Sequence, residues 1–231
     1  MGEDITWEHV VGLARDAILK DNVIVIADTS IWFDYFEPMP GPTHDRDYAK
    51  EKSYLDALIK SGKLRLPKLI KDELIRTYNN KYRSYMNDET MPAGAEFNIQ
   101  LKKKLKEIPE EKVDKRYCIE DVEGMYHDIW HNKDQYEAEL YRWGYTKARD
   151  AYGNPIWNDL DDAGKAAFLE SSSGPSGKDK DILAIAAHLK AVRKGYFVIL
   201  FVRDKDFLAF SHIIYKKFGL LAVRPEDIMP D

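Results

Sequence analysis

The feature that most constrains this chain is a short apolar run that ends in an acid, within NVIVIADTSIWFDYFE at residues 22–37. Val23 to Ala27 are apolar and mostly β-branched, which is typical of a strand covered on both faces in a parallel sheet. The run stops at Asp28. Because ligands of open α/β sheets bind just beyond the carboxyl ends of strands, Asp28 is a candidate functional residue. Capping of the following helix is the alternative explanation for this acid.

A second junction of the same kind lies near the other end of the chain. Tyr196 to Val202 form another apolar run of strand length, and the residues that follow it include Asp204 and Asp206. Carboxylates that lie close together raise one another's pKa, so a fold that gathers them without cations loses stability. A bound divalent metal ion would remove that cost.

These junctions resemble the PIN-domain ribonucleases. The resemblance rests on ADTSIWFDYF, LPKLIKDELIRTY, GKDKDILAIAAHLK and VILFVRDKDFLAF, which occur in the order typical of that family, and covers about the first 85 and last 60 residues. It implies an α/β, PIN-like fold with a parallel sheet in three α/β/α layers. One departure is Val202, since many members of the family carry Thr or Ser at that position.

The resemblance also implies a set of metal ligands and catalytic acids. They are Asp28, Glu73, Asp179 and Asp204, with Asp181 and Asp206 as lesser candidates. Oxygen ligands of this kind favour Mg²⁺ or Mn²⁺ over zinc. We expect the metal to be held mainly by Asp28 and Asp204 and to activate a water molecule, with Thr29 or Ser30 orienting Asp28 or that water. Family members of this type leave a 5′-phosphate and a 3′-hydroxyl.

Two of these acids have alternative explanations. Glu73 could instead form a surface ion pair with Arg76, three residues further along a helix. Residues two apart on a helix point about 200° away from each other, so Asp179 and Asp181 should not face one site. Helical periodicity does not choose between them, whereas the resemblance selects Asp179.

Composition and length place the remaining limits. A chain of 231 residues that is 44% hydrophobic can form one sizeable core, and we expect a single domain, residues 1–231, with a helical insertion at residues 87–176. The net charge of -5 argues against a protein that coats nucleic acid through a basic face. Cys118 is the single cysteine, and the chain has neither a basic leader nor an apolar run of membrane length, so we expect a cytoplasmic protein with no membrane partner.

The insertion is predicted to be mainly helical, over residues 95–108 and 119–151, and it is rich in aromatic residues. Aromatic rings either stack on unpaired bases or fill the core of a small helical unit. A neighbouring basic run is the candidate RNA-binding surface, with a solvated helix face as its alternative; it contains Lys102, Lys103, Lys104 and Lys106. Glu123, His127 and His131 are spaced four apart and would share one helix face.

Together these features predict a Mg²⁺- or Mn²⁺-dependent endoribonuclease that hydrolyses single-stranded or structured RNA. The alternatives are a noncatalytic PIN-like module that binds RNA or protein, and a nuclease directed at DNA. A phosphatase of the haloacid-dehalogenase type is disfavoured, because DTSIWFD lacks the Gly-Thr turn that such enzymes carry after the first acid. A role as a toxin or in RNA processing stays open, as do an antitoxin, another protein partner and a homodimer.

Overall fold

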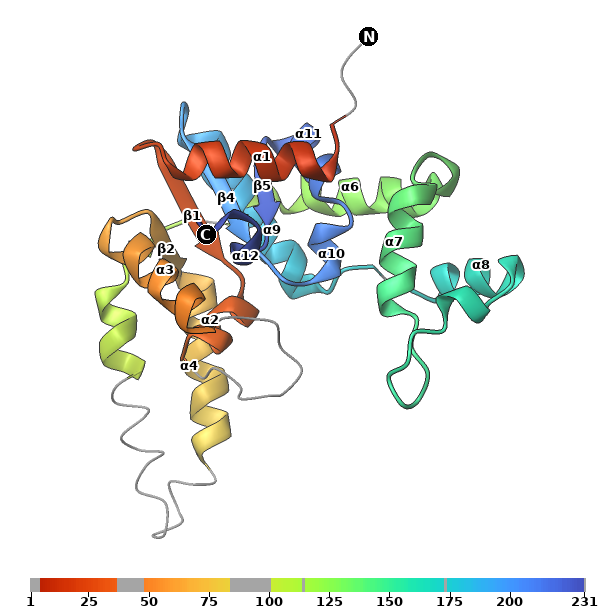
Figure 1. Cartoon of the computed structure of the whole chain (residues 1–231), viewed down its shortest axis with the longest axis horizontal. Helices are drawn as coiled ribbons and strands as arrows, with labels where there is room; N and C mark the ends of the chain where they lie inside the picture. The colour runs from red at the N-terminus through yellow and green to blue at the C-terminus, as the bar shows by residue number, and fades with distance from the viewer. Residues whose placement is uncertain (1–4, 37–47, 84–100, 114, 173, 231) are drawn as a thin grey trace.

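The computed structural model describes residues 5–36, 48–83, 101–113, 115–172 and 174–230. At its centre lies a sheet of five strands in the order β3-β2-β1-β4-β5, and every neighbouring pair is parallel (Figure 1). The strands are β1 (Val23–Ala27), β2 (Leu64–Pro67), β3 (Glu110–Glu111), β4 (Phe197–Phe201) and β5 (Leu220–Val223). The predicted α/β class with a parallel sheet is therefore confirmed.

Helices connect and cover these strands. They are α1 (Trp7–Ile18), α2 (Thr29–Phe36), α3 (Tyr48–Lys60), α4 (Lys68–Arg83), α6 (Ile119–His131), α7 (Glu137–Lys147), α8 (Asp162–Ser171), α9 (Gly177–Val192), α10 (Lys205–Leu208), α11 (Ser211–Phe218) and α12 (Pro225–Ile228). Residues 101–107 are also helical, and short 3₁₀ turns occur at Lys115–Tyr117, Lys133–Gln135 and Trp157–Asp159.

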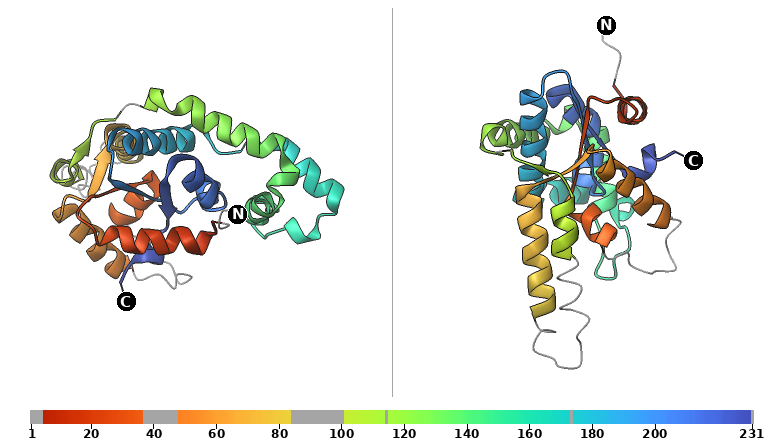
Figure 2. Two further views of the ribbon diagram at one scale, coloured as in Figure 1. Left: turned by 90° about the horizontal axis from the view of Figure 1, so that it is seen from above. Right: turned by 90° about the vertical axis from the view of Figure 1, so that its left-hand side faces the viewer.

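The sheet is the centre of the hydrophobic core because its middle strands carry apolar residues on both faces. All five residues of β1 and all four of β5 are buried. Figure 2 shows α9 and α4 on one face of the sheet and α1 and α3 on the other, an arrangement consistent with three α/β/α layers. Strands covered in this way need continuous apolar runs, which is the pattern from which β1 and β4 were predicted.

The first helix, α1, begins after a residue type that favours helix starts. Thr6 is its N-cap, and the Thr6 hydroxyl accepts a hydrogen bond from the His9 amide at 3.3 Å. The apolar side of α1, which includes Val10, Ala14 and Ala17, is buried. None of the helices in the described part of the chain is long and apolar enough to cross a lipid bilayer.

The segment predicted as a helical insertion, residues 87–176, contributes to the sheet as well as to the helices. Glu110 and Glu111 form β3, which pairs with β2 at the edge of the sheet. Leu101, Leu105 and Ile108 pack into the common core ahead of that strand. Within the described residues, the part that stands away from the sheet therefore begins only after β3, with α7 and α8 furthest from it in Figure 1.

The segment predicted to be helical over residues 119–151 contains two α-helices rather than one. The chain forms α6, turns at Asn132–Tyr136, and then forms α7. Asn132 leaves the helical conformation with ψ at 51°, and it begins a polar run, NKDQ, that carries no apolar residue to pack on the core. The break lets α7 cross towards α10, which one unbroken helix could not do.

Aromatic residues hold α6, α7 and α8 together. Trp143 of α7 packs edge-on against Trp130 of α6, with ring centroids 5.3 Å apart, and Trp157 packs in the same way against Phe168 of α8 at 5.8 Å. A Cβ atom at Gly144 would collide with the ring of Trp157, so this contact requires glycine. The structure therefore supports the explanation that Trp143 and Trp157 fill the core of a small helical unit.

Candidate active site

The register of the sheet brings the two predicted strand-to-acid junctions to one edge. Ala27 of β1 pairs with Phe201 of β4, and the Asp28 amide donates a hydrogen bond to the Phe201 carbonyl at 2.8 Å. Because both strands run in the same direction, Asp28 and Asp204 leave the sheet at the same edge. Val202, the position of the noted departure from the family, is fully buried and adds no hydroxyl to this edge.

Asp28 is held in place by its own turn. Its carboxylate accepts hydrogen bonds from the Thr29 amide at 2.7 Å and from the Ser30 hydroxyl at 2.8 Å. Only 7% of Asp28 is exposed, and this burial raises the pKa of its carboxyl group, although the two hydrogen bonds oppose the shift. The negative charge of Asp179 raises it further.

Glu73 joins this group through Thr29. The Thr29 hydroxyl donates a hydrogen bond to Glu73 Oε2 at 3.0 Å, and Lys178 Nζ lies 2.5 Å from Glu73 Oε1. A cavity of about 320 Å³ opens beside this pair, and Arg76 and Asp181 also line it. Glu73 is thus directed towards the edge of the sheet, while Arg76 lies across the same cavity.

Asp179 and Asp181 both lie inside α9, so the geometric argument that separates them applies. Asp179 takes part in the capping box of the helix: its amide donates to the Ser176 hydroxyl, and its carboxylate accepts from the Ser176 amide at 3.0 Å. Asp181 lines the cavity beside Glu73, whereas the charge of Asp179 raises the pKa of Asp28.

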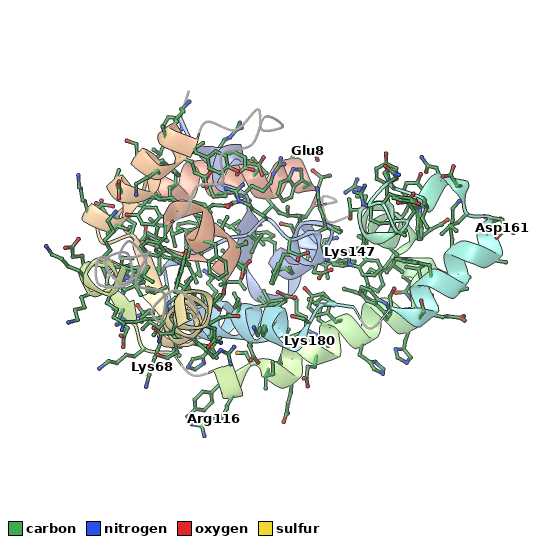
Figure 3. The ribbon with its side chains drawn as sticks, turned by 90° about the horizontal axis from the view of Figure 1, so that it is seen from below. Glu8, Lys68, Arg116, Lys147, Asp161 and Lys180 are labelled. Carbon is green, nitrogen blue, oxygen red and sulfur yellow. The ribbon has the colours of Figure 1, made fainter. Side chains whose placement is uncertain are left out.

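A lysine of α7 binds the two acids that follow β4. Lys147 Nζ, at the end of α7, lies 2.9 Å from Asp204 Oδ1 and 2.9 Å from Asp206 Oδ2 (Figure 3). The Trp143 indole, one turn earlier, donates to Asp206 Oδ1 at 2.5 Å. Asp204 also caps α10 by accepting from the Asp206 amide at 2.9 Å. We call this arrangement of Trp143, Lys147, Asp204 and Asp206 the α7 clamp.

The pKa values of the two acids in the clamp shift in opposite directions. Burial raises the pKa of Asp206, and the indole and ammonium hydrogen bonds only partly offset this. Burial acts in the same direction on Asp204, but the Asp206 amide and Lys147 outweigh it and lower the pKa of Asp204. Lys147 loses solvation, yet its two carboxylate partners raise its pKa, so it stays protonated. The clamp is a charge-assisted, half-buried network.

Tyr126 of α6 contacts the junction between β4 and α10. Its fully buried hydroxyl donates to the Asp206 carbonyl at 2.9 Å. Burial raises the pKa of the Tyr126 hydroxyl well above its usual value, and the charges of Asp206, Asp179 and Asp204 add to the effect. The Tyr126 hydroxyl is therefore a buried hydrogen-bond partner of the β4–α10 junction.

Three acids of this edge are paired with lysines, which a divalent ion would have to displace. Among the described residues, no group of three or more His, Cys, Asp or Glu side chains is placed to hold one metal. The donors are carboxylates of the kind that Mg²⁺ and Mn²⁺ prefer. Of these donors, Asp204 and Asp206 are bound by the ammonium group of Lys147, and Glu73 is bound by that of Lys178.

Other sequence-based candidates lie elsewhere. The exposed Lys102, Lys103, Lys104 and Lys106 lie on the helix of residues 101–107, where Lys104 Nζ approaches the ring of Tyr35 at 5.6 Å. Glu123, His127 and His131 do line one cavity, and the two imidazoles stack at 3.7 Å. These three side chains are nevertheless not placed to hold one metal, as is true throughout the described part of the chain.

Sequence reasoning missed four residues of this edge: Tyr126, Trp143, Lys147 and Lys178. Lys178 carried a local signal, since it lies between Gly177 and Asp179 at the start of a predicted helix. The other three lie in the segment that matched no motif. Trp143 and Lys147 are four residues apart, which places them on one helix face, but nothing local shows that this face meets Asp206.

Comparison of the chain with models of protein families, with curated proteins and with solved structures gave no match.

Proposed function

We propose that this protein is a Mg²⁺- or Mn²⁺-dependent endoribonuclease with a PIN-like fold. The observation that carries the proposal is the register between β1 and β4, which brings Asp28 and Asp204 to the carboxyl edge of one parallel sheet. Two observations support including Glu73 and Asp179: the Thr29 hydroxyl donates to Glu73, and the charge of Asp179 raises the pKa of Asp28. This is the part of an open α/β sheet where ligands bind.

The lysines set a condition on this proposal. Asp204 and Glu73 can accept a divalent ion only if Lys147 and Lys178 move away from them. Thr29 and Ser30 have a separate role, because their hydrogen bonds fix the Asp28 carboxylate and orient Glu73 without any cation. The basic run that contains Lys102 is proposed as an additional contact for RNA phosphates.

The experiment is cleavage of an end-labelled single-stranded RNA in Mn²⁺ and in EDTA. We expect cleavage by the wild-type chain only with the metal, and a loss of at least about 100-fold in kcat/KM for Asp28→Asn, equivalent to about 2.7 kcal/mol of transition-state stabilisation. Asp16→Asn, an exposed acid on α1, is the matched control and should cleave normally. Unchanged cleavage by Asp28→Asn would contradict the proposal, and DNA cleaved faster than RNA would redirect it to a DNA nuclease.

One observation favours a second candidate, a noncatalytic module that binds RNA or protein. Lys147 pairs with Asp204 and Asp206, and Lys178 pairs with Glu73, so these three acids have cationic partners without a metal. RNA binding without any divalent-dependent cleavage, in a chain whose melting temperature Mn²⁺ does not change, would favour this candidate over the enzyme.

A further inference from the structure

A groove lies beside the α7 clamp, between α7, α10 and the start of α1. Its volume is about 450 Å³, and the residues that line it include Trp7, Tyr141, Arg142, Tyr145, Lys205 and Arg224. We call it the α7–α10 groove. Figure 3 marks its surroundings, with Glu8 on the α1 side and Lys147 at the contact between α7 and α10.

Two exposed tyrosines give the groove flat apolar surfaces. Tyr141 and Tyr145 are 48% and 42% exposed, and their spacing of four residues places them one helical turn apart on the same face of α7. The Tyr141 hydroxyl donates to Asn158 at 3.1 Å, and its ring meets Trp157 edge-on at 5.9 Å. The Tyr141 ring is therefore held in position and exposed. In contrast, the rings of Trp143 and Trp157 are buried.

The charges of the groove are mainly positive. Arg142 and Lys205 are exposed, while the Arg224 guanidinium is bound to Asp227 at 2.6 Å. Glu8 is the carboxylate among the lining residues and opposes these cations. The whole chain carries a net charge of -5, so a groove with this excess of cations differs from the average surface. Rings that alternate with cations fit a strand of unpaired nucleotides, which offers bases for stacking and phosphates for the cations.

The groove and the acids share the contact between α7 and α10. Trp143 and Lys147 on one side of α7 bind Asp204 and Asp206, and Tyr141 and Tyr145 on another side line the groove. Lys205 lines the groove and lies in the chain between the two acids of the clamp. A strand bound in the groove would thus pass next to the candidate site.

We propose that the α7–α10 groove binds single-stranded RNA, with bases stacked on Tyr141 and Tyr145 and phosphates bound by Arg142 and Lys205. This inference rests on the proposed function in taking RNA as the substrate, but binding in the groove requires no cleavage. Double-stranded RNA would bind more weakly, because its bases are already stacked on one another and leave no free face for the tyrosines.

The test is fluorescence anisotropy with a labelled single-stranded RNA of about ten nucleotides, using the full-length Asp28→Asn chain in EDTA so that no RNA is cut. Adding Tyr141→Leu and Tyr145→Leu should raise Kd at least about tenfold, because each stacked base contributes about 1–3 kcal/mol. Tyr152→Leu is the matched control, since this tyrosine is 91% exposed in the same segment and lies outside the groove. Its Kd should stay within about twofold of the parent.

A second pair of changes tests the groove without touching packed rings. Arg142→Ala with Lys205→Ala should make the slope of log K against log salt shallower by about 1.4, or about 0.7 for each phosphate that the chain no longer neutralises. Lys60→Ala with Lys194→Ala removes two exposed charges elsewhere and should leave the slope unchanged. An unchanged Kd and slope in both groove variants would overturn the inference. So would equal or tighter binding of a DNA strand or of double-stranded RNA.

Failure of the groove and failure of the nuclease proposal give different results. Groove-dependent RNA binding by a wild-type chain that cleaves nothing supports the groove and contradicts the enzyme. Metal-dependent cleavage with binding that is insensitive to all four groove changes supports the enzyme and overturns the groove.

Discussion

The β1 side and the β4 side of the candidate site each pair acids with a lysine, and they differ in how deeply the pair is buried. On the β1 side, Lys178 is 61% exposed and binds Glu73 from the first turn of its own helix. On the β4 side, Lys147 is 31% exposed and binds Asp206, which is 7% exposed, while Trp143 completes the contact. An exposed pair contributes little to stability, whereas a buried carboxylate that loses its partner is costly.

Lys178 can therefore leave its carboxylate partner more easily than Lys147, which is packed at the contact between α7 and α10. Lys178 has solvent around it, so displacing it from Glu73 leaves its ammonium group hydrated. Displacing Lys147 leaves Asp206 buried with only the Trp143 indole and the turn of α10. The packing of α7 therefore contributes to the stability of the site, in addition to any contact that α6, α7 or α8 makes with a substrate.

The largest expected effect comes from breaking the clamp. Lys147→Met should lower the free energy of unfolding by about 2 kcal/mol, because Asp206 keeps a buried charge while its cationic partner is removed. Lys178→Met, the matched change on the β1 side, should cost less than about 0.5 kcal/mol. Urea unfolding of both variants without metal measures the difference. Equal losses would show that the two sides are energetically alike.

Activity should distinguish the two acids of α9. Asp179→Asn should lower kcat/KM at least about tenfold, or about 1.4 kcal/mol, because the charge of Asp179 acts on Asp28. Asp181→Asn should stay within about threefold of wild type, since Asp181 faces the cavity beside Glu73. Parallel kinetics at a fixed Mn²⁺ concentration decide the matter. A larger loss for Asp181→Asn would show that Asp181, and not Asp179, is the third acid of the site.

Metal binding should also depend on the clamp. If Lys147 competes with a divalent ion for Asp204, Lys147→Met should increase Mn²⁺ affinity about threefold, which adds about 0.7 kcal/mol of stabilisation at saturating metal. Thermal unfolding over a Mn²⁺ series gives this value without an activity assay. Lys178→Met serves as the comparison. A larger gain in Mn²⁺ affinity for that variant would show that a lysine competes with the metal more strongly at Glu73 than at Asp204.

The smallest effect concerns the buried charge of Asp28. Burial raises its pKa in the folded chain, so the folded state binds this proton more tightly than the unfolded state does. The charged form therefore costs stability above the folded pKa, and the cost disappears as the pH falls through that value towards the ordinary one. Asp28→Asn should raise the metal-free melting temperature at neutral pH by less than about 4 °C. The gain should shrink on acidification, and a gain that grows instead would reverse the assigned direction.

Much of the sheet and the order of its acids could be predicted from local patterns. The apolar runs before Asp28 and Asp204 predict β1 and β4 because a strand covered on both faces needs apolar residues on both. Thr6 predicts the start of α1 for an equally local reason, since its hydroxyl bonds an amide three residues away. The position of Glu73 on a helix after β2 followed from periodicity within α4.

Tertiary structure alone decided what neutralises those acids. Lys147 and Asp204 are 57 residues apart in the chain, and Trp143 and Asp206 are 63 apart. Helical periodicity relates residues within a few turns, so it cannot specify which face of α7 meets α10. That contact depends on the turn after α6 and on the packing of Trp130, Trp143 and Trp157, which fix α7 against the sheet edge. The sequence alone determined where the carboxylates leave the sheet, and the packing of distant helices determined that lysines lie on them.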